Sequence, residues 1–147
     1  IAMYFVDRQN IEKSLVFMEN KLNILETMKD CDGSINELAL ERLIHVLTDC
    51  MLDVSNAIID GFIMRDPGSY EDIVDILLDE RVINKEMEVQ LKAILPLRKQ
   101  IVQEYKEVDH LLLEEEIHKN IQAFVQFPSA VRRYLQDELG PVSAFKK

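Results

Sequence analysis

Residues 34–62 have the sequence SINELALERLIHVLTDCMLDVSNAIIDGF, in which apolar side chains recur every three or four positions. This spacing predicts a long helix, which a Ser34–Glu37 capping box would begin and Gly61 would end. A helix that is apolar over more than one stripe usually lies at the centre of a fold, so we expect it to contact several neighbours. One face carries Leu40, Leu43, Leu47, Met51, Val54 and Ile58, while Leu38, Val46 and Ala57 fall elsewhere around the helix.

Residues 7–30 precede this segment and show a second pattern of helical spacing. Their single apolar stripe consists of Ile11, Leu15, Met18, Leu22, Leu25 and Met28. Cys31, Asp32 and Gly33 interrupt the pattern, and glycine is a suitable residue to end a helix. The sequence therefore predicts two consecutive helices joined by a short turn.

Residues 65–70 (RDPGSY) are the clearest loop after the long helix, because Pro67 and Gly68 favour a tight turn. Ser69 and Asp72 have the spacing of a helix cap and predict a third, shorter helix. The apolar residues of this helix are Ile73, Ile76 and Leu77.

Two further helices are expected in the remainder of the chain. Asn84 should cap the fourth, in which Pro96 predicts either a kink or the start of a new helix that carries residues 98–106. Asp109 should cap the fifth, which Pro128 would break or restart before it ends near residues 139–141.

The composition agrees with one all-α domain over residues 1–147, an up-and-down antiparallel bundle of about five helices. With only 4 Gly and 4 Pro the chain has few turns, which favours long helices. No apolar run approaches the ~20 residues that span a bilayer, and no signal-peptide pattern is present, so we expect a soluble, cytoplasmic protein. Its two cysteines, Cys31 and Cys50, should be reduced. Ile1 and Ala2 precede Met3 and are interpreted as a possible remnant of an expression vector.

The formal net charge of −10 would repel nucleic acid at long range, so contact with RNA requires a local basic patch. Arg98 lies in the middle of an apolar stripe, where a guanidinium is costly unless it is paired or lines a wet cleft. Lys99, Gln103 and Lys106 follow on the neighbouring strip. Periodicity alone favours a plainer interpretation, in which Arg98 lies at the edge of the core and the lysines are solvated. The stripe itself consists of Leu91, Leu95, Val102 and Tyr105.

The segment Arg98-Lys-Gln-Ile-Val-Gln103-Glu-Tyr105 resembles the Arg-x-x-x-x-His-x-Tyr motif of the HepT-type branch of the HEPN superfamily. Arg98 and Tyr105 match the motif, and Asp109 falls where such proteins often carry an Asp. Residues 67–70 (PGSY) resemble the Pro-x-Ser-Tyr loop of the same family. Helix order and length agree as well, so the resemblance covers nearly the whole chain and implies a HEPN-like bundle.

The resemblance implies a homodimer in which the motif helices of two copies line a shared cleft and cut RNA without a metal or cofactor. Arg98 would hold the phosphate, Lys99 and Lys106 would add phosphate or RNA contacts, and Asp109 would support them. Many family members are toxins paired with a nucleotidyltransferase antitoxin, which silences them by attaching AMP to the motif Tyr. Here that residue would be Tyr105.

The sequence departs from the family pattern at Gln103, which stands where the motif His should be. An amide cannot act as general acid or base near neutral pH, and losing a general base typically costs about 10²–10⁴ in rate. Gln103 can still hydrogen-bond a phosphate or a sugar. Lys99 also replaces the Asn that commonly follows the motif Arg, which can loosen the geometry.

Three histidines, His45, His110 and His118, are candidate substitutes, although a histidine on a charged helix face is usually only solvated. His45 and Asp49 have the spacing of metal ligands, but no third ligand stands out, so no metal site is predicted. We interpret Asp49 and Asp53 as part of the charged face of a long amphipathic helix.

Three functional hypotheses follow. The first is a HepT-like ribonuclease toxin that uses Arg98 and Gln103 and is regulated through Tyr105 by a nucleotidyltransferase partner. The second is a dimeric, non-catalytic module that binds a nucleotide, RNA or a partner protein. The third is a purely structural helical dimer, for which Arg98→Ala would change no binding.

Overall fold

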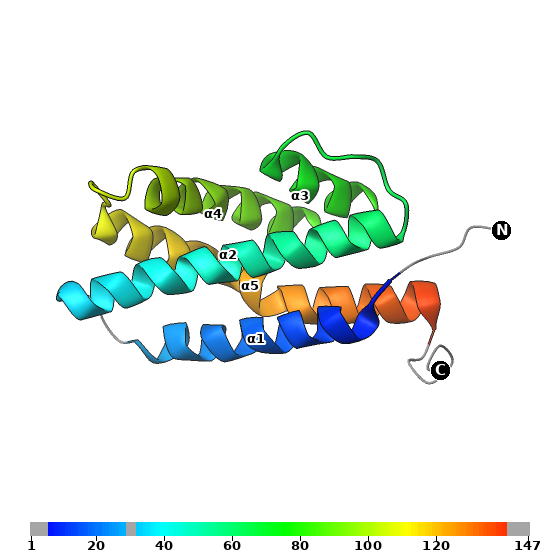
Figure 1. Ribbon diagram of the computed structural model, residues 1–147, viewed down its shortest axis with the longest axis horizontal. Helices are drawn as coiled ribbons and strands as arrows, with labels where there is room; N and C mark the ends of the chain where they lie inside the picture. The colour runs from blue at the N-terminus through cyan, green and yellow to red at the C-terminus, as the bar shows by residue number, and fades with distance from the viewer. Residues whose placement is uncertain (1–5, 29–31, 141–147) are drawn as a thin grey trace.

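Residues 6–28 and 32–140 are described by the computed structural model, and they form five helices and no strand. The helices are α1 (Arg8–Thr27), α2 (Ser34–Gly61), α3 (Tyr70–Asp79), α4 (Lys85–Gln103) and α5 (His110–Leu139). α1, α2, α4 and α5 run alternately up and down, and the short α3 lies against α2 and α4 (Figure 1). The prediction of an all-α, up-and-down bundle of about five helices is confirmed. The expectations for residues 1–2 and for Cys31 fall outside the described residues.

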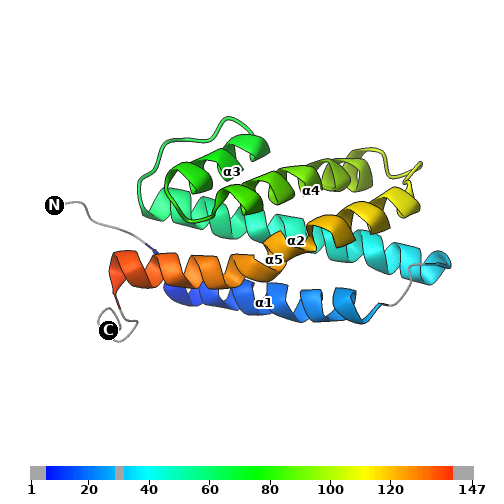
Figure 2. The same ribbon diagram turned by 180° about the vertical axis from the view of Figure 1, so that it is seen from behind.

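α2 is the central helix of this bundle, because it contacts α1, α3, α4 and α5. In Figure 1 it crosses the middle of the molecule between α1 and α4, and Figure 2 shows α5 crossing it from the opposite side. All six residues of the expected apolar face are at most 6% exposed. The prediction of a central, broadly apolar helix is therefore confirmed.

α1 closes the bundle against α2 and α5. Five of the six residues on its expected stripe are buried, and Met28 is partly buried at the end of the helix. Polar contacts also join α1 to α5. The Nη1 of Arg8 donates to the carbonyl oxygen of Gly140 over 2.8 Å, and Arg132 pairs with Glu12 and Glu19. In the described residues, no helix combines the length and apolar character needed to cross a membrane.

The expected helix caps are mostly confirmed. The side chains of Ser69, Asn84 and Asp109 each accept a hydrogen bond from a backbone N–H in the first turn of α3, α4 and α5. The predicted Ser34 cap is wrong, because Ser34 is already the first residue of α2 and no side chain caps this helix. Gly33 precedes it with a φ of 89°, a left-handed conformation that glycine adopts without strain, so this glycine starts α2 and does not end α1.

Neither proline divides its helix. α4 is continuous through Pro96, so the predicted start of a new helix there is wrong, and α5 is likewise continuous through Pro128. A proline inside a helix costs about 3 kcal/mol or more. The residues next to Pro96, which are Ile94, Leu95 and Leu97, are all buried. Burial of each such side chain contributes about 1.5–3 kcal/mol to the free energy of unfolding. Their packing together outweighs the lost backbone hydrogen bond.

α4 ends earlier than its apolar pattern predicts. Its last residue is Gln103, and the backbone of Glu104 leaves the helical region while its N–H donates to the carbonyl of Gln100. The expectation that the helix carries residues 98–106 is therefore wrong. Val102 and Tyr105 are 39% and 65% exposed, so only Leu91 and Leu95 of the expected stripe belong to the core.

Candidate functional site

Arg98 lies on α4 and reaches across to the middle of α2. Its Nε donates to the Oδ1 of Asp49 over 2.5 Å, and its side chain is only 18% exposed. In the part of the chain that the structure describes, the two terminal guanidinium nitrogens donate no hydrogen bond. Asp49 thus neutralises Arg98 on one edge and leaves its Nη edge able to bind a second anion.

His45 joins the same carboxylate from one helical turn earlier on α2. Its Nε2 lies 3.1 Å from the Oδ2 of Asp49, and its side chain is 29% exposed. Asp49 therefore contacts Arg98 through one carboxylate oxygen and His45 through the other. We call Arg98, Asp49 and His45, together with the Tyr70 ring described next, the Arg98 cluster.

Tyr70 brings the loop before α3 to this cluster. The guanidinium carbon of Arg98 lies 5.1 Å from the centroid of the Tyr70 ring, which is within cation–π range. Tyr70 is the first residue of α3 and is 46% exposed. One edge of the cluster is therefore aromatic and open to solvent.

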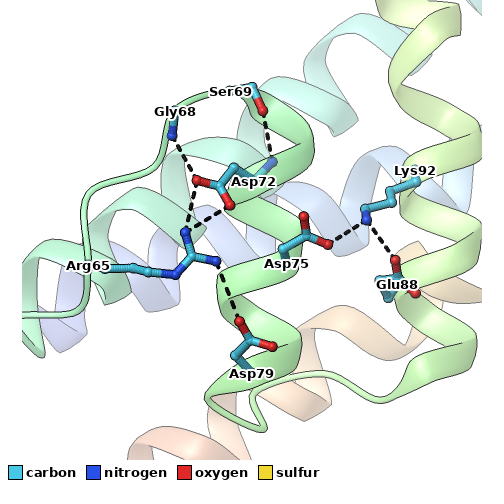
Figure 3. Close-up of polar contacts among 8 residues, drawn as sticks. All are labelled: Arg65, Gly68, Ser69, Asp72, Asp75, Asp79, Glu88 and Lys92. Atoms are coloured by element: carbon cyan, nitrogen blue, oxygen red, sulfur yellow. Dashed lines mark hydrogen bonds and ion pairs between the residues drawn. The ribbon is translucent and has the colours of Figure 1, made fainter.

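The loop that precedes Tyr70 is held by Asp72, as Figure 3 shows. The Asp72 carboxylate accepts from the Gly68 N–H over 2.9 Å and from Arg65, while the Asp72 N–H donates to the Ser69 hydroxyl. The hydrogen bond from Gly68, followed by that from Arg65, lowers the pKa of Asp72. The Pro-x-Ser-Tyr loop is therefore a capped turn that sets the position of Tyr70.

Lys92 fixes α3 to α4 on the side of α3 away from the loop (Figure 3). Its ammonium group pairs with Asp75 of α3 and, over 2.8 Å, with Glu88 of α4. The Glu88 carboxylate also pairs with Lys85. These contacts, first with Asp75 and then with Glu88, raise the pKa of Lys92, and they hold Tyr70 of α3 in register with Arg98 of α4.

Polar residues on α2 continue toward the start of α5. The Nε2 of His110 lies 2.6 Å from the Oε2 of Glu41, and its Nδ1 lies 3.9 Å from Glu37. Glu37, Glu41, His45 and Asp49 follow one another at four-residue spacing, so they form one strip of α2 that contacts both α5 and α4. We call these four residues the α2 polar row.

Gln103, Tyr105 and Lys106 gather at a different place, at the C-terminal end of α4 and in the turn that follows it. Together with Glu104 and Glu107 they line one shallow pocket, and the Lys106 ammonium group lies 5.9 Å from the centroid of the Tyr105 ring. Asp109 caps α5 with its side chain, and its backbone N–H donates to the Gln100 side chain over 2.7 Å. These contacts fix the turn between α4 and α5.

The structure therefore divides the residues singled out in the sequence into two groups within one chain. Arg98 belongs to the Arg98 cluster, whereas Gln103, Tyr105 and Lys106 line the pocket after α4. Lys99 is exposed beside Arg98, and Asp109 acts locally as a helix cap.

The sequence pattern does not reveal Asp49 and His45 as neighbours of Arg98, because both fall on the charged face of α2. The signal that indicates a partner on another helix is Arg98 itself. A guanidinium in an apolar stripe requires a carboxylate partner from a neighbouring element.

Cys50 lies next to Asp49 in sequence but does not extend the site. It is a free thiol whose Sγ donates to the carbonyl of Ser14, and burial raises its pKa to about 11. A thiol with such a pKa stays protonated at neutral pH and is a poor nucleophile. In residues 6–28 and 32–140, no group of three or more His, Cys, Asp or Glu side chains is placed to hold a metal ion.

Comparisons with known proteins agree with this fold. Residues 12–131 match the model of the family described as "Ribonuclease HepT-like". A relative from Bacillus subtilis (strain 168), named "Putative RNase YutE", is 49% identical over 98% of this chain and 100% of its own length. A solved structure, described as that of a cytosolic protein of unknown function, YutE from Bacillus subtilis, superposes with a TM-score of 0.93. At 49% identity it covers 97% of this chain and 100% of that one. The chain therefore belongs to the HepT-like ribonuclease family.

Proposed function

We propose that this chain is a metal-independent ribonuclease in which Arg98 binds the scissile phosphate. The supporting observation is the state of Arg98, which is largely buried, paired through Nε with Asp49 and, among the described residues, without a hydrogen bond at its Nη edge. Such an edge matches two phosphate oxygens, and charge that develops on the phosphate would be stabilised there. Family membership and the name of the Bacillus subtilis relative agree with this activity.

The proposed reaction is attack by the ribose 2′-hydroxyl on the adjacent phosphorus, with departure of the 5′ oxygen. Gln103 would hold the ribose or a phosphate oxygen by hydrogen bonding, since an amide can donate and accept but cannot transfer a proton usefully at neutral pH. Lys99 and Lys106 are exposed cations that would contact the RNA backbone on either side.

A homodimer would bring the two groups of residues together. Arg98 and Gln103 lie in different surroundings on α4, and a cleft formed by the α4 helices of two copies would contain both residues from each copy. The exposed apolar side chains near the end of α4 and the start of α5 are suited to such a contact. They are Val102, Leu111 and Leu112, at 39%, 65% and 39% exposure. A light-scattering mass of one 17.1 kDa chain would contradict the dimer.

We also propose a partner, a nucleotidyltransferase that acts as antitoxin by adding AMP to Tyr105. Tyr105 is 65% exposed beyond the end of α4, so its hydroxyl can be reached by a second protein. Incubation with such an enzyme and ATP should add one AMP to the chain, detected by mass spectrometry, and Tyr105→Phe should prevent it. Modification that persists in Tyr105→Phe would reject this site.

A second candidate function is a dimeric module that binds RNA, a nucleotide or a partner protein without cutting. Gln103 at the position of the motif His favours it, as does the net charge of −10, which opposes nucleic-acid binding outside a local patch. The third hypothesis is a purely structural dimer. It gives no reason for the Nη edge of Arg98 to be left without a hydrogen bond.

The deciding experiment is RNA cleavage in the presence of EDTA by wild type, Arg98→Ala and Gln103→His. Cleavage by wild type that Arg98→Ala removes supports the ribonuclease. Silence of wild type, with activity gained in Gln103→His, would identify the binding module. Titration of the same RNA against wild type and Arg98→Ala separates the binding module from a structural dimer, for which both affinities would be equal.

A further inference from the structure

We propose that His45 transfers the proton of the ribose hydroxyl in this ribonuclease, an inference that rests on the proposed function. The reaction needs a group that accepts a proton near neutral pH, and Gln103 cannot supply it. His45 is the imidazole that shares a carboxylate with the phosphate-binding Arg98. The proposal therefore assigns the chemistry to α2, outside the motif on α4.

The contacts of His45 leave one ring nitrogen for substrate. Its Nε2 lies against the Oδ2 of Asp49 at 3.1 Å, and in the described residues its Nδ1 has no partner. A carboxylate beside Nε2 would favour the ring proton on that nitrogen, which would leave the lone pair on Nδ1. With its side chain 29% exposed, His45 can meet a ligand from solvent.

Arg98 would hold the phosphate beside the same carboxylate that His45 contacts. Because Asp49 contacts Arg98 through Oδ1 and His45 through Oδ2, the guanidinium and the imidazole flank one carboxylate. A phosphate on the Nη edge of Arg98 would then bring its 3′-linked ribose toward His45. The Tyr70 ring beside Arg98 offers a stacking surface for a base of single-stranded RNA.

The other two histidines are poorer candidates. Both ring nitrogens of His110 face carboxylates, Glu41 at 2.6 Å and Glu37 at 3.9 Å, so its contacts serve to join α5 to α2. The Nδ1 of His118 bonds the backbone carbonyl of Glu114 on its own helix, and no contact links it to Arg98. His45 alone among the described histidines shares a partner with Arg98.

The proposed step moves one proton and exchanges one bond to phosphorus for another. The His45 Nδ1 takes the proton of the 2′-hydroxyl while the 2′ oxygen forms a bond to phosphorus. The bond from phosphorus to the 5′ oxygen breaks, and its electron pair leaves on that oxygen, which takes a proton from water. The products are a 2′,3′-cyclic phosphate and a 5′-hydroxyl end. His45 then returns its proton to solvent, so no oxidant, reductant or metal is required.

The charged groups around His45 come from α2 and α4. Asp49 and Glu41 lie one turn away on either side along α2, and Arg98 approaches from α4. Because a base takes up the proton in this step, the pH profile of the cleavage rate should change when position 45 carries an amide.

The test compares full-length wild type, His45→Gln, His45→Ala and Arg98→Ala under single-turnover conditions with EDTA. His118→Ala is the control for loss of a histidine outside the cluster. A short RNA is the substrate, and the same RNA with 2′-deoxyribose measures binding without cleavage. His45→Gln should cut about 10²–10⁴-fold more slowly with unchanged affinity for the 2′-deoxy strand. Added imidazole should restore part of the rate in His45→Ala.

The outcomes separate this inference from the function on which it rests. If Arg98→Ala abolishes cleavage while His45→Gln keeps the wild-type rate, His45 is excluded and the ribonuclease stands. An equal loss of affinity and rate in His45→Gln would also overturn the proposal, because it would assign His45 to binding. If wild type does not cut RNA, both proposals fail. Circular dichroism of each variant shows whether it is folded before its rate is interpreted.

Discussion

The contact between Arg98 and Asp49 leads to a prediction for Asp49→Asn, which keeps the side-chain volume and removes the charge. A buried hydrogen bond to a charged group contributes about 1.5–3 kcal/mol, whereas exposed ion pairs contribute about 0.2–1 kcal/mol. Asp49 is 39% exposed and Arg98 is 18% exposed, so solvent screens part of the interaction. We therefore expect an energy of coupling between the two residues of about 1 kcal/mol.

A double-mutant cycle measures this coupling directly. The free energy of unfolding is determined from urea titrations, followed by circular dichroism, for wild type, Asp49→Asn, Arg98→Gln and the double variant. The two single substitutions should each destabilise the protein, and the double variant should be less destabilised than their sum by about 1 kcal/mol. For a chain of this size, that energy corresponds to a Tm change of roughly 2–4 °C.

Asp53→Asn is the matched control. Asp53 lies one turn further along α2, is exposed, and has no ion pair among the described residues. Its cycle with Arg98→Gln should give a coupling near zero. If the Asp49 cycle gives a coupling within about 0.3 kcal/mol of zero, Asp49 does not hold Arg98, and the assignment of a free Nη edge loses its basis.

Three further predictions concern stability. Ser69→Ala removes the hydroxyl that caps α3 and should lower the free energy of unfolding by about 1 kcal/mol in urea titrations, whereas an unchanged midpoint would contradict the cap. Phe124→Ala empties a fully buried position and should cost about 3–5 kcal/mol by the same assay; a loss below 1 kcal/mol would mean that the core collapses around it. The hydrogen bond from Arg132 lowers the pKa of Glu19. A carboxyl with a lowered pKa in the folded state contributes stability that is present above its ordinary pKa of 4.5 and is lost as pH falls through the lower folded value. The loss of stability between pH 5 and pH 3 should therefore be smaller in Glu19→Gln than in wild type, and parallel pH curves would refute the pairing.

The fold was largely predictable from the sequence because its signals are local. The apolar face of α2 and the caps at Ser69, Asn84 and Asp109 depend on residues within a turn or two of each other. The Ser34 cap failed by one residue, since Gly33 adopts a backbone conformation that the capping pattern does not consider.

The site was less predictable because it depends on packing between helices. The apolar character of Val102 and Tyr105 continues the pattern of α4, but the backbone leaves the helix at Glu104, so the pattern alone placed Tyr105 in the wrong surroundings. The partner of Arg98 lies 49 positions away on α2. No periodicity within either helix reveals which residues face each other across that interface.

The central position of α2 has a consequence for how a ligand would be received. His45 and Asp49 stand on the helix that contacts all four others, so its backbone amides cannot open without unfolding the bundle as a whole. Native-state hydrogen exchange in the middle of α2 should therefore match the global free energy of unfolding. A site mounted on such a helix exists in its final form before any ligand arrives, and binding there incurs little ordering entropy. Any conformational change on ligand binding would then occur around the site, in the shorter α3 and in the turn after α4.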